Sequence, residues 1–170
     1  MDDFGVLLER EIPRLRRYAR ALTRDASRAD DLVQDCLCRA LSKAHLWKPG
    51  TDLRAWLFTM LHNQHVNRIR SAVREGMSSP VEDMAQRLSS PAVQTASLEL
   101  RDLDRALARL PEEQRQVVLL VGLEGLRYEQ VAEILDVPVG TVRSRLSRAR
   151  EALRRHMGMH AEDGDRLVAA

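Results

Sequence analysis

This sequence of 170 residues has only two cysteines, almost balanced charge and only short apolar stretches, and the first and last of these features each exclude a class of protein. Two cysteines, Cys36 and Cys38, are too few for a disulfide framework and fit a reducing cytosol. The longest apolar run, Val117 to Leu123 with one glycine, is far shorter than the ~20 residues that span a bilayer. The sequence begins Met-Asp-Asp, which is acidic where a secretory signal needs a basic segment. We therefore expect a cytoplasmic protein without membrane insertion.

The charged residues are divided unevenly along the chain, although the net charge is only +2. Residues 41–75 carry six Lys and Arg against two acids, and residues 139–157 carry six Arg against one acid. The stretches 76–138 and 158–170 are acidic. Two basic islands indicate two contacts with a polyanion, although solvated helix faces have the same composition.

Apolar residues recur at helical spacing through much of the chain, and no convincing β-strand is present. The first helix covers residues 4–22, and Pro13 inside it predicts either a kink there or a helix start nearby. Either Asp25 or Ser27 can cap the second helix. A third long helix is predicted from about residue 53 to residue 74.

Glycine, serine and proline interrupt the helical pattern between residues 76 and 97, which predicts a linker. Helical spacing resumes at Leu98, and Pro111 suits the first turn of a further helix that includes the apolar run 117–121. The apolar content of 44% is too high for a disordered chain, and the length allows two small domains. We expect an all-α protein with two small helical domains joined by a flexible linker.

Residues 128–146 carry the most specific local signal, a helix-turn-helix. A short helix at 128–135 is followed by the turn 136–138 and by a helix with a single apolar stripe. Small polar side chains flanked by arginines on the opposite face suit a helix that enters the DNA major groove. The residues of this face are Arg143, Ser144, Arg145, Ser147 and Arg148. An arginine-rich helix that only covers a core is the alternative, and the preceding helix, the turn and the basic charge favour DNA binding.

The basic island of the N-terminal half has a comparable face. It consists of Trp56, Asn63, Asn67, Arg70 and Arg74. An aromatic ring, two amides and two arginines can stack on a base, bond to base edges and neutralise phosphates, which suits unpaired strands. Trp56 could equally belong to the hydrophobic core.

Four motifs together resemble those of the bacterial extracytoplasmic-function (ECF) RNA polymerase sigma factors, of the sigma-70 family. In chain order they are Asp30–Asp35 (DDLVQD), Leu53–Phe58 (LRAWLF) running on to Asn63, Leu110–Arg115 (LPEEQR) and Pro138–Leu146 (PVGTVRSRL). The resemblance covers about residues 4–157. It implies a sigma domain two at 1–75, a linker at 76–97, a sigma domain four at 98–157 with a tail at 158–170, and no third domain.

The resemblance also implies partners for particular residues. Asp31, Gln34 and Asp35 are similar to the surface that binds the β′ clamp helices of core RNA polymerase, and contact with the β flap is implied as well. The loop 47–52 with Asn63 and Asn67 is similar to the region that holds a flipped base of the minus-ten element. The recognition-helix residues above would contact the minus-thirty-five element. The linker would thread the RNA-exit and active-site channels of the polymerase, and an anti-sigma factor would clamp both domains.

Three positions depart from the family pattern. Arg127 stands where a capping serine is usual, which predicts a weaker cap for the first helix of the helix-turn-helix. Asp136 replaces a frequent turn glycine, and Ser147 is small where some relatives have a bulky residue, which leaves the base preference there open.

Other chemistries have few residues to support them. His62 and His65 have a spacing that can bind a metal, but no third ligand lies nearby in the sequence, so we expect no metal site and no cofactor. Cys36 belongs to an apolar stripe. No catalytic residues are expected, because no phosphate loop or nucleophile motif is present. A stand-alone helix-turn-helix regulator and a sigma-like decoy that sequesters an anti-sigma factor remain the alternatives to a sigma factor.

Overall fold

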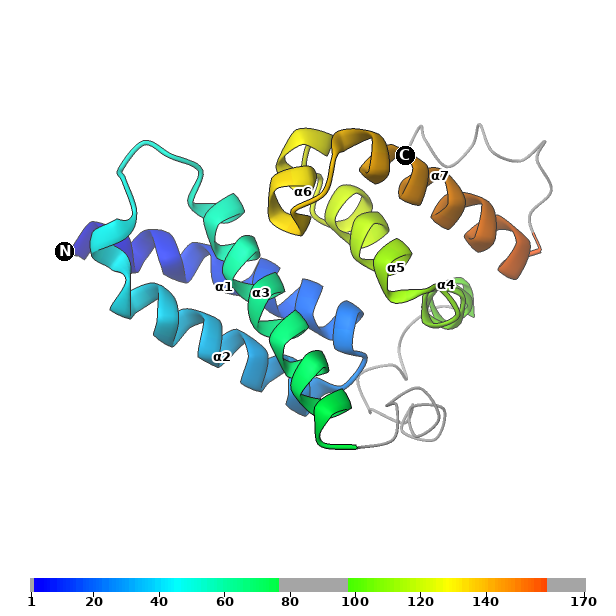
Figure 1. Ribbon diagram of the computed structural model, residues 1–170, viewed down its shortest axis with the longest axis horizontal. Coiled ribbons are helices and arrows are strands. Elements are labelled where there is room, and N and C mark those ends of the chain that lie inside the picture. Colours follow the sequence, from blue (N-terminus) through cyan, green and yellow to red (C-terminus); the bar gives the residue numbers. More distant parts are fainter. Residues whose placement is uncertain (1, 77–97, 159–170) are drawn as a thin grey trace.

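The computed structural model describes residues 2–76 and 98–158, and within these ranges it contains helices and no strand (Figure 1). The elements of the N-terminal half are α1 (Asp2–Thr23), α2 (Ala26–Ser42), the short 3₁₀ helix η1 (Ala44–Leu46) and α3 (Leu53–Arg74). Those of the C-terminal half are α4 (Leu98–Ala108), α5 (Glu112–Val118), the π-helical turn η4 (Leu119–Leu123), α6 (Tyr128–Leu135) and α7 (Val139–His156). The all-α prediction is confirmed. The predicted linker and tail lie outside the described residues, apart from Gly76 and Gly158.

Helix α1 continues through Pro13, so a helix start near this proline is wrong. Pro13 is exposed, whereas Leu8 before it and Leu15 after it are buried on the same stripe. Burial of an amphipathic face supplies most of the stability of a helix in a protein, and here it outweighs the hydrogen bond that proline cannot donate.

The helix starts and turns follow the local sequence closely. Asp25 caps α2 by accepting a hydrogen bond from the backbone N–H of Arg28 at 3.0 Å, which confirms one of the two predicted caps. Asp52 caps α3 in the same way through the N–H of Ala55 at 3.1 Å. The turn between α6 and α7 places Asp136 at φ 54°, a left-handed conformation that aspartate tolerates.

The LPEEQR motif joins α4 to α5. Pro111 is the residue before α5 rather than part of its first turn, a shift of one position from the prediction. Arg115 reaches back to the end of α4 and donates hydrogen bonds to the carbonyl oxygens of Leu107, Ala108 and Leu110 at 2.8–3.0 Å. The last carbonyls of a helix have no partner within the helix, so this arginine completes the end of α4 and sets the angle at which α5 leaves.

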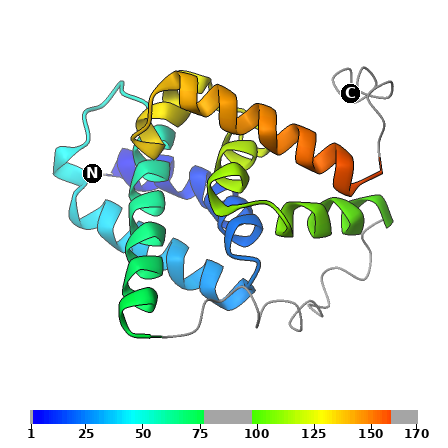
Figure 2. The same ribbon diagram turned by 45° about the vertical axis from the view of Figure 1, so that its right-hand side comes forward.

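Helix α3 crosses α1 and α2 and meets α6 of the C-terminal half, while α1 also contacts η4 (Figure 2). The buried residues of α3 are Leu57, Phe58, Leu61, His62 and His65. The ring of Phe58 packs edge-on against Tyr18 of α1 with 5.2 Å between centroids. A single hydrophobic cluster continues from these residues to Val117, Leu120 and Val131 of the C-terminal half. The two halves therefore share one core in this structure.

Polar side chains reinforce the contact between the halves at four points. Arg17 forms a two-pronged ion pair with the buried Glu124, with distances of 3.0 and 3.1 Å. Arg24 pairs with Asp104 at 2.9 Å, and Gln130 of α6 donates a hydrogen bond to Asp52 at 2.5 Å. His65 Nε2 lies 2.6 Å from Glu112 Oε1. Each contact joins residues more than 45 positions apart, so helical periodicity carries no sign of them.

Two buried histidines of α3 lie at this contact. Burial lowers the pKa of His62 to about 4, with a further lowering from His65 and a smaller opposing effect from Glu112. Burial would raise the pKa of Glu112, but its hydrogen bond with His65 and the charges of His65 and Arg115 outweigh this, and its pKa is lowered. The contact between the halves is thus built for a neutral His62 and an ionised Glu112.

We expect the folded protein to lose stability as the pH falls from 7 to 5, because His62 takes up a proton more readily in the unfolded chain. Its pKa falls from an ordinary value of 6.5 to about 4 on folding, so the loss begins near pH 6.5 and continues toward pH 4. Between pH 7 and pH 5 this corresponds to about 2 kcal/mol of unfolding free energy. Urea denaturation at several pH values between 7 and 5 measures this change in unfolding free energy.

His62→Gln removes the titrating group and is expected to flatten this pH dependence, whereas His45→Gln, at an exposed position of η1, is expected to leave it unchanged. An unaltered pH dependence in His62→Gln would contradict the assignment to His62.

Candidate nucleic-acid interface

The predicted helix-turn-helix is confirmed as α6, a turn at 136–138, and α7. Val142, Leu146 and Ala149 of α7 are buried against the C-terminal core. The opposite side of α7 leaves Arg143, Ser144, Ser147 and Arg148 exposed. In Figure 1 the first turns of α7 lie at the upper edge of the molecule, next to α6. The face that the sequence predicts for DNA is therefore accessible.

The arginines of α7 are not equivalent. Arg143 lies over the ring of Tyr128 with its guanidinium carbon 6.0 Å from the ring centroid, which restrains the side chain at the start of the recognition face. Arg145 is only 21% exposed and pairs with Glu113 of α5 at 3.3 Å. Arg148 has neither an ion pair nor a hydrogen bond to another side chain in the described part of the protein. Of the three, Arg148 is the one whose charge is fully available to a partner.

The start of α6 is stabilised by Gln130 and not by the side chain at the capping position. The side chain of Arg127 has no hydrogen-bond acceptor that could cap the helix, as we expect from an arginine at this position. The side-chain oxygen of Gln130 instead accepts the backbone N–H of Arg127 at 3.0 Å. The amide nitrogen of the same glutamine donates to Asp52, which also caps α3. One hydrogen-bonded chain thus links the first turn of α6 to the first turn of α3.

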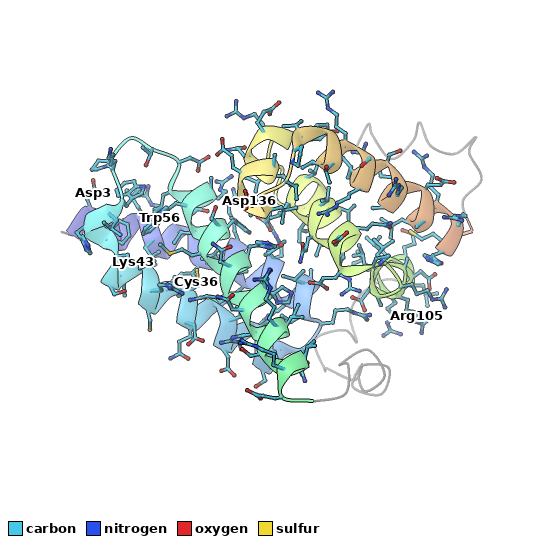
Figure 3. The ribbon with its side chains drawn as sticks, viewed as in Figure 1. Asp3, Cys36, Lys43, Trp56, Arg105 and Asp136 are labelled. Atoms are coloured by element: carbon cyan, nitrogen blue, oxygen red, sulfur yellow. The ribbon has the colours of Figure 1, made fainter. Side chains whose placement is uncertain are left out.

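The predicted face of α3 is present, except at Trp56. Asn63, Asn67, Arg70 and Arg74 are exposed along one side of the helix. Trp56 is partly buried near the start of α3 (Figure 3), and its ring meets the Phe4 ring edge-on with 6.3 Å between centroids. Phe4 in turn packs against Trp47 of the loop before α3 at 5.4 Å. Trp56 therefore supports the loop 47–52 through an aromatic cluster, which corresponds to the core alternative for this residue.

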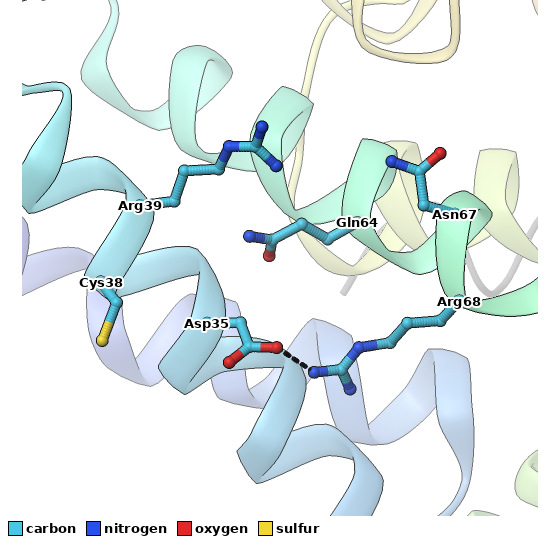
Figure 4. A pocket seen from close by; sticks show the side chains of 6 residues that line it. All are labelled: Asp35, Cys38, Arg39, Gln64, Asn67 and Arg68. Atoms are coloured by element: carbon cyan, nitrogen blue, oxygen red, sulfur yellow. Dashed lines mark hydrogen bonds and ion pairs between the residues drawn. The ribbon is translucent and has the colours of Figure 1, made fainter. Parts of the chain in front are cut away.

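The predicted polymerase-binding residues, Asp31, Gln34 and Asp35, are exposed on α2. Asp35 does not stand alone, because it forms an ion pair with Arg68 of α3. An open groove lies between the two helices at this place, lined by Asp35, Cys38 and Arg39 from α2 and Gln64, Asn67 and Arg68 from α3 (Figure 4). We call it the α2–α3 groove.

Sequence patterns singled out Asp35 and Asn67 but missed the other residues of the groove. Arg68 follows Asn67 directly, and neighbouring residues of a helix point about 100° apart. Arg68 is therefore not among the residues that helical spacing groups with Asn67 on one face. Arg39 lies four positions after Asp35, on the same side of α2, and this spacing was the available signal.

The remaining candidates have structural roles. His62 and His65 are buried between the halves, and no group of three metal-ligating residues occurs within the described ranges. Cys36 is buried, and burial raises the pKa of its thiol to about 12, which keeps it protonated. Cys38 is exposed and borders the α2–α3 groove. No helix in the described part of the chain has the length and apolar character that crossing a membrane requires.

Comparison with known families matches both halves of the chain. Residues 8–62 match the Sigma2 domain of PhyR, and residues 100–153 match Sigma-70, region 4. The second match covers the helix-turn-helix, α6 and α7 up to residue 153, whereas the first ends at residue 62, before the exposed face of α3.

Individual relatives extend the match over most of the chain. The ECF RNA polymerase sigma factor EcfG of Rhodopseudomonas palustris is 44% identical over 146 residues, which are 84% of this chain and 78% of EcfG. SigM of Mycobacterium tuberculosis is 35% identical over 91% of this chain and 77% of its own. The sigma factor RpoE of Bartonella quintana, solved in complex with the anti-sigma factor NepR, has a TM-score of 0.77 at 35% identity and covers 93% of this chain and 98% of its own. From the order of the motifs, the helix-turn-helix and these relatives, the chain belongs to the ECF RNA polymerase sigma factors.

Proposed function

We propose that this sigma factor binds core RNA polymerase through α2 and directs it to promoters by contacting two separate DNA elements. Helix α7 contacts the minus-thirty-five element as duplex, and α3 contacts the minus-ten element as a melted strand. The observation that carries the proposal is the presence of two exposed basic faces, one in each half of a single chain. A regulator that used only its helix-turn-helix would have no need of the second face.

The chemistry of α7 supports duplex recognition. Ser144 and Ser147 occupy the centre of its exposed face, and their short side chains allow the helix to approach base edges closely. Arg143 and Arg148 lie beside them, within reach of bases or phosphates. Arg145 forms an ion pair with Glu113 on the flank of the helix. We therefore assign it a contact with a phosphate group and no contact with a base.

The chemistry of α3 supports binding of an unpaired strand. Asn63 and Asn67 offer donors and acceptors to the edges of bases, and Arg70 and Arg74 offer charge to phosphates farther along the helix. Trp56 contributes by supporting the loop 47–52, whose residues would surround a flipped base.

The exposed acidic residues of α2 supply the proposed polymerase contact. Asp31, Gln34 and Asp35 lie on a side of α2 that faces away from the core and would meet the β′ clamp helices. Contact of the C-terminal half with the β flap completes the assignment to polymerase. The protein would work in the cytoplasm, where the polymerase acts.

An anti-sigma factor is the proposed regulator. RpoE of Bartonella quintana, which aligns with 93% of this chain, was solved in complex with the anti-sigma factor NepR. A partner that held both halves would hide the two basic faces and so prevent promoter binding.

A decoy that only sequesters an anti-sigma factor is the second candidate, because the N-terminal half matches the Sigma2 domain of PhyR. PhyR is itself described as an anti-anti-sigma factor in a complex with NepR. A decoy needs no DNA-binding side chains, whereas this chain keeps exposed arginines and amides on both faces. These residues favour the sigma factor.

Run-off transcription tests the function directly. The purified chain with core RNA polymerase is expected to initiate from a specific promoter selected from a randomised library, while the chain alone is expected to bind the same duplex weakly. Failure to initiate, combined with tight binding to an anti-sigma factor, would favour the decoy. Tight sequence-specific binding without polymerase would favour the stand-alone regulator.

Arg148→Ala tests recognition of the upstream element. If Arg148 bonds to a base, the variant is expected to lose about 1–3 kcal/mol of discrimination at one position of the minus-thirty-five element. Competitive binding of the holoenzyme to a set of single-base promoter variants measures this. Arg16→Ala, which removes an exposed arginine from α1, is the matched control and is expected to have no effect. An unchanged base preference in Arg148→Ala would remove Arg148 from the base contacts.

A further inference from the structure

The α2–α3 groove combines positive charge and amides, and Asn67 is its one residue with a DNA contact already proposed. Arg39 and Arg68 line it from opposite helices, with Gln64 between them and Asn67 on α3 beside them (Figure 4). We propose that this groove binds a phosphate group of the melted promoter strand, with Arg39 and Arg68 as its cationic ligands. The inference rests on the proposed function, because it extends the path of the strand from α3 onto α2.

The available charge in the groove comes mainly from Arg39. Its side chain is exposed and forms no ion pair or hydrogen bond with another side chain among residues 2–76 and 98–158. An exposed guanidinium without a carboxylate partner presents its full charge and a planar set of donors, a combination that suits phosphate. In Figure 4 its guanidinium points across the groove toward α3 rather than along α2.

The amides supply a second polar contact. Gln64 extends its side chain into the groove, where its amide nitrogen can donate a hydrogen bond to a phosphate oxygen. Asn67 belongs both to the groove and to the exposed face of α3. A strand that lies along Asn63, Asn67 and Arg70 therefore reaches the groove without leaving the protein surface.

The carboxylate of Asp35 repels a phosphate group in the groove. Its interactions therefore determine when the groove can bind phosphate. It pairs with Arg68, but the Asp35 and Arg68 side chains are 61% and 40% exposed, and an ion pair in such contact with water is weak. Asp35 is also a proposed contact of the polymerase. When the polymerase binds Asp35, Arg68 is released toward the strand, so polymerase binding and strand binding strengthen each other.

Arg39→Gln in the complete holoenzyme tests the groove. The probe is a fork-junction DNA whose minus-ten segment is single-stranded, and its affinity is measured by fluorescence anisotropy between 50 and 300 mM salt. One lost phosphate contact lowers the slope of log affinity against log salt by about 0.7, which is about fivefold in affinity at 0.1 M salt. Arg39→Lys keeps the charge and is expected to restore most of the slope, and Arg16→Gln is the matched control.

Asp35→Asn tests the coupling between polymerase binding and strand binding, because it is expected to weaken the first without weakening the second. It is expected to weaken binding to core polymerase, because a proposed polymerase contact is lost. Once the holoenzyme is assembled at saturating concentration, strand affinity is expected to equal or exceed that of the unchanged protein, since Arg68 no longer has a competing carboxylate.

Three results would overturn the groove proposal. They are an unchanged salt slope in Arg39→Gln, a loss of polymerase affinity in Arg39→Gln without a loss of strand affinity, and a weaker strand complex in saturated Asp35→Asn. These three tests require that the protein without these substitutions initiates transcription with core polymerase. Absence of initiation by the unchanged protein would count against the proposed function instead.

Discussion

Helix α3 packs both against α1 and α2 and against the C-terminal half, and the DNA-facing surface of the N-terminal half depends on this packing. One side of this helix is buried against α1 and α2, and another meets the C-terminal half through His65 and the capping residue Asp52. Only the remaining side, with Asn63, Asn67 and Arg70, is open. The same packing that stabilises the core thus determines which residues of α3 can meet a DNA strand.

The core that the two halves share includes ionisable groups at the place where the halves meet. It contains His62, His65, Glu112 and Glu124, all of them ionisable, next to a continuous apolar cluster. Contacts between domains of one chain resemble transient protein interfaces, which are more polar than permanent cores. A polar contact loses less when it opens, because its groups find partners in water. This suits a protein whose halves each carry a surface for a different DNA element.

The sequence anticipated those features that depend on residues close together in the chain. The third helix, predicted from about residue 53 to residue 74 by its apolar spacing, is α3, Leu53–Arg74, and the structure adds Asp52 as its cap. The turn of the helix-turn-helix follows from Asp136, which adopts the left-handed conformation in place of a glycine. The start of α1 was uncertain because Pro13 counted against a continuous helix locally, while the packing of Leu8 and Leu15 that compensates for it was not visible.

The sequence by itself therefore determined the family, through four ordered motifs, together with the helices and the faces of α3 and α7 that bear charge. Tertiary structure decided which of these charges are free. It paired Asp35 with Arg68 and Arg145 with Glu113, and it placed Trp56 against Phe4. The physical reason is the range of each signal. Periodicity and capping act within a few residues, whereas ion pairs and ring contacts join residues that only the packing of whole helices brings together.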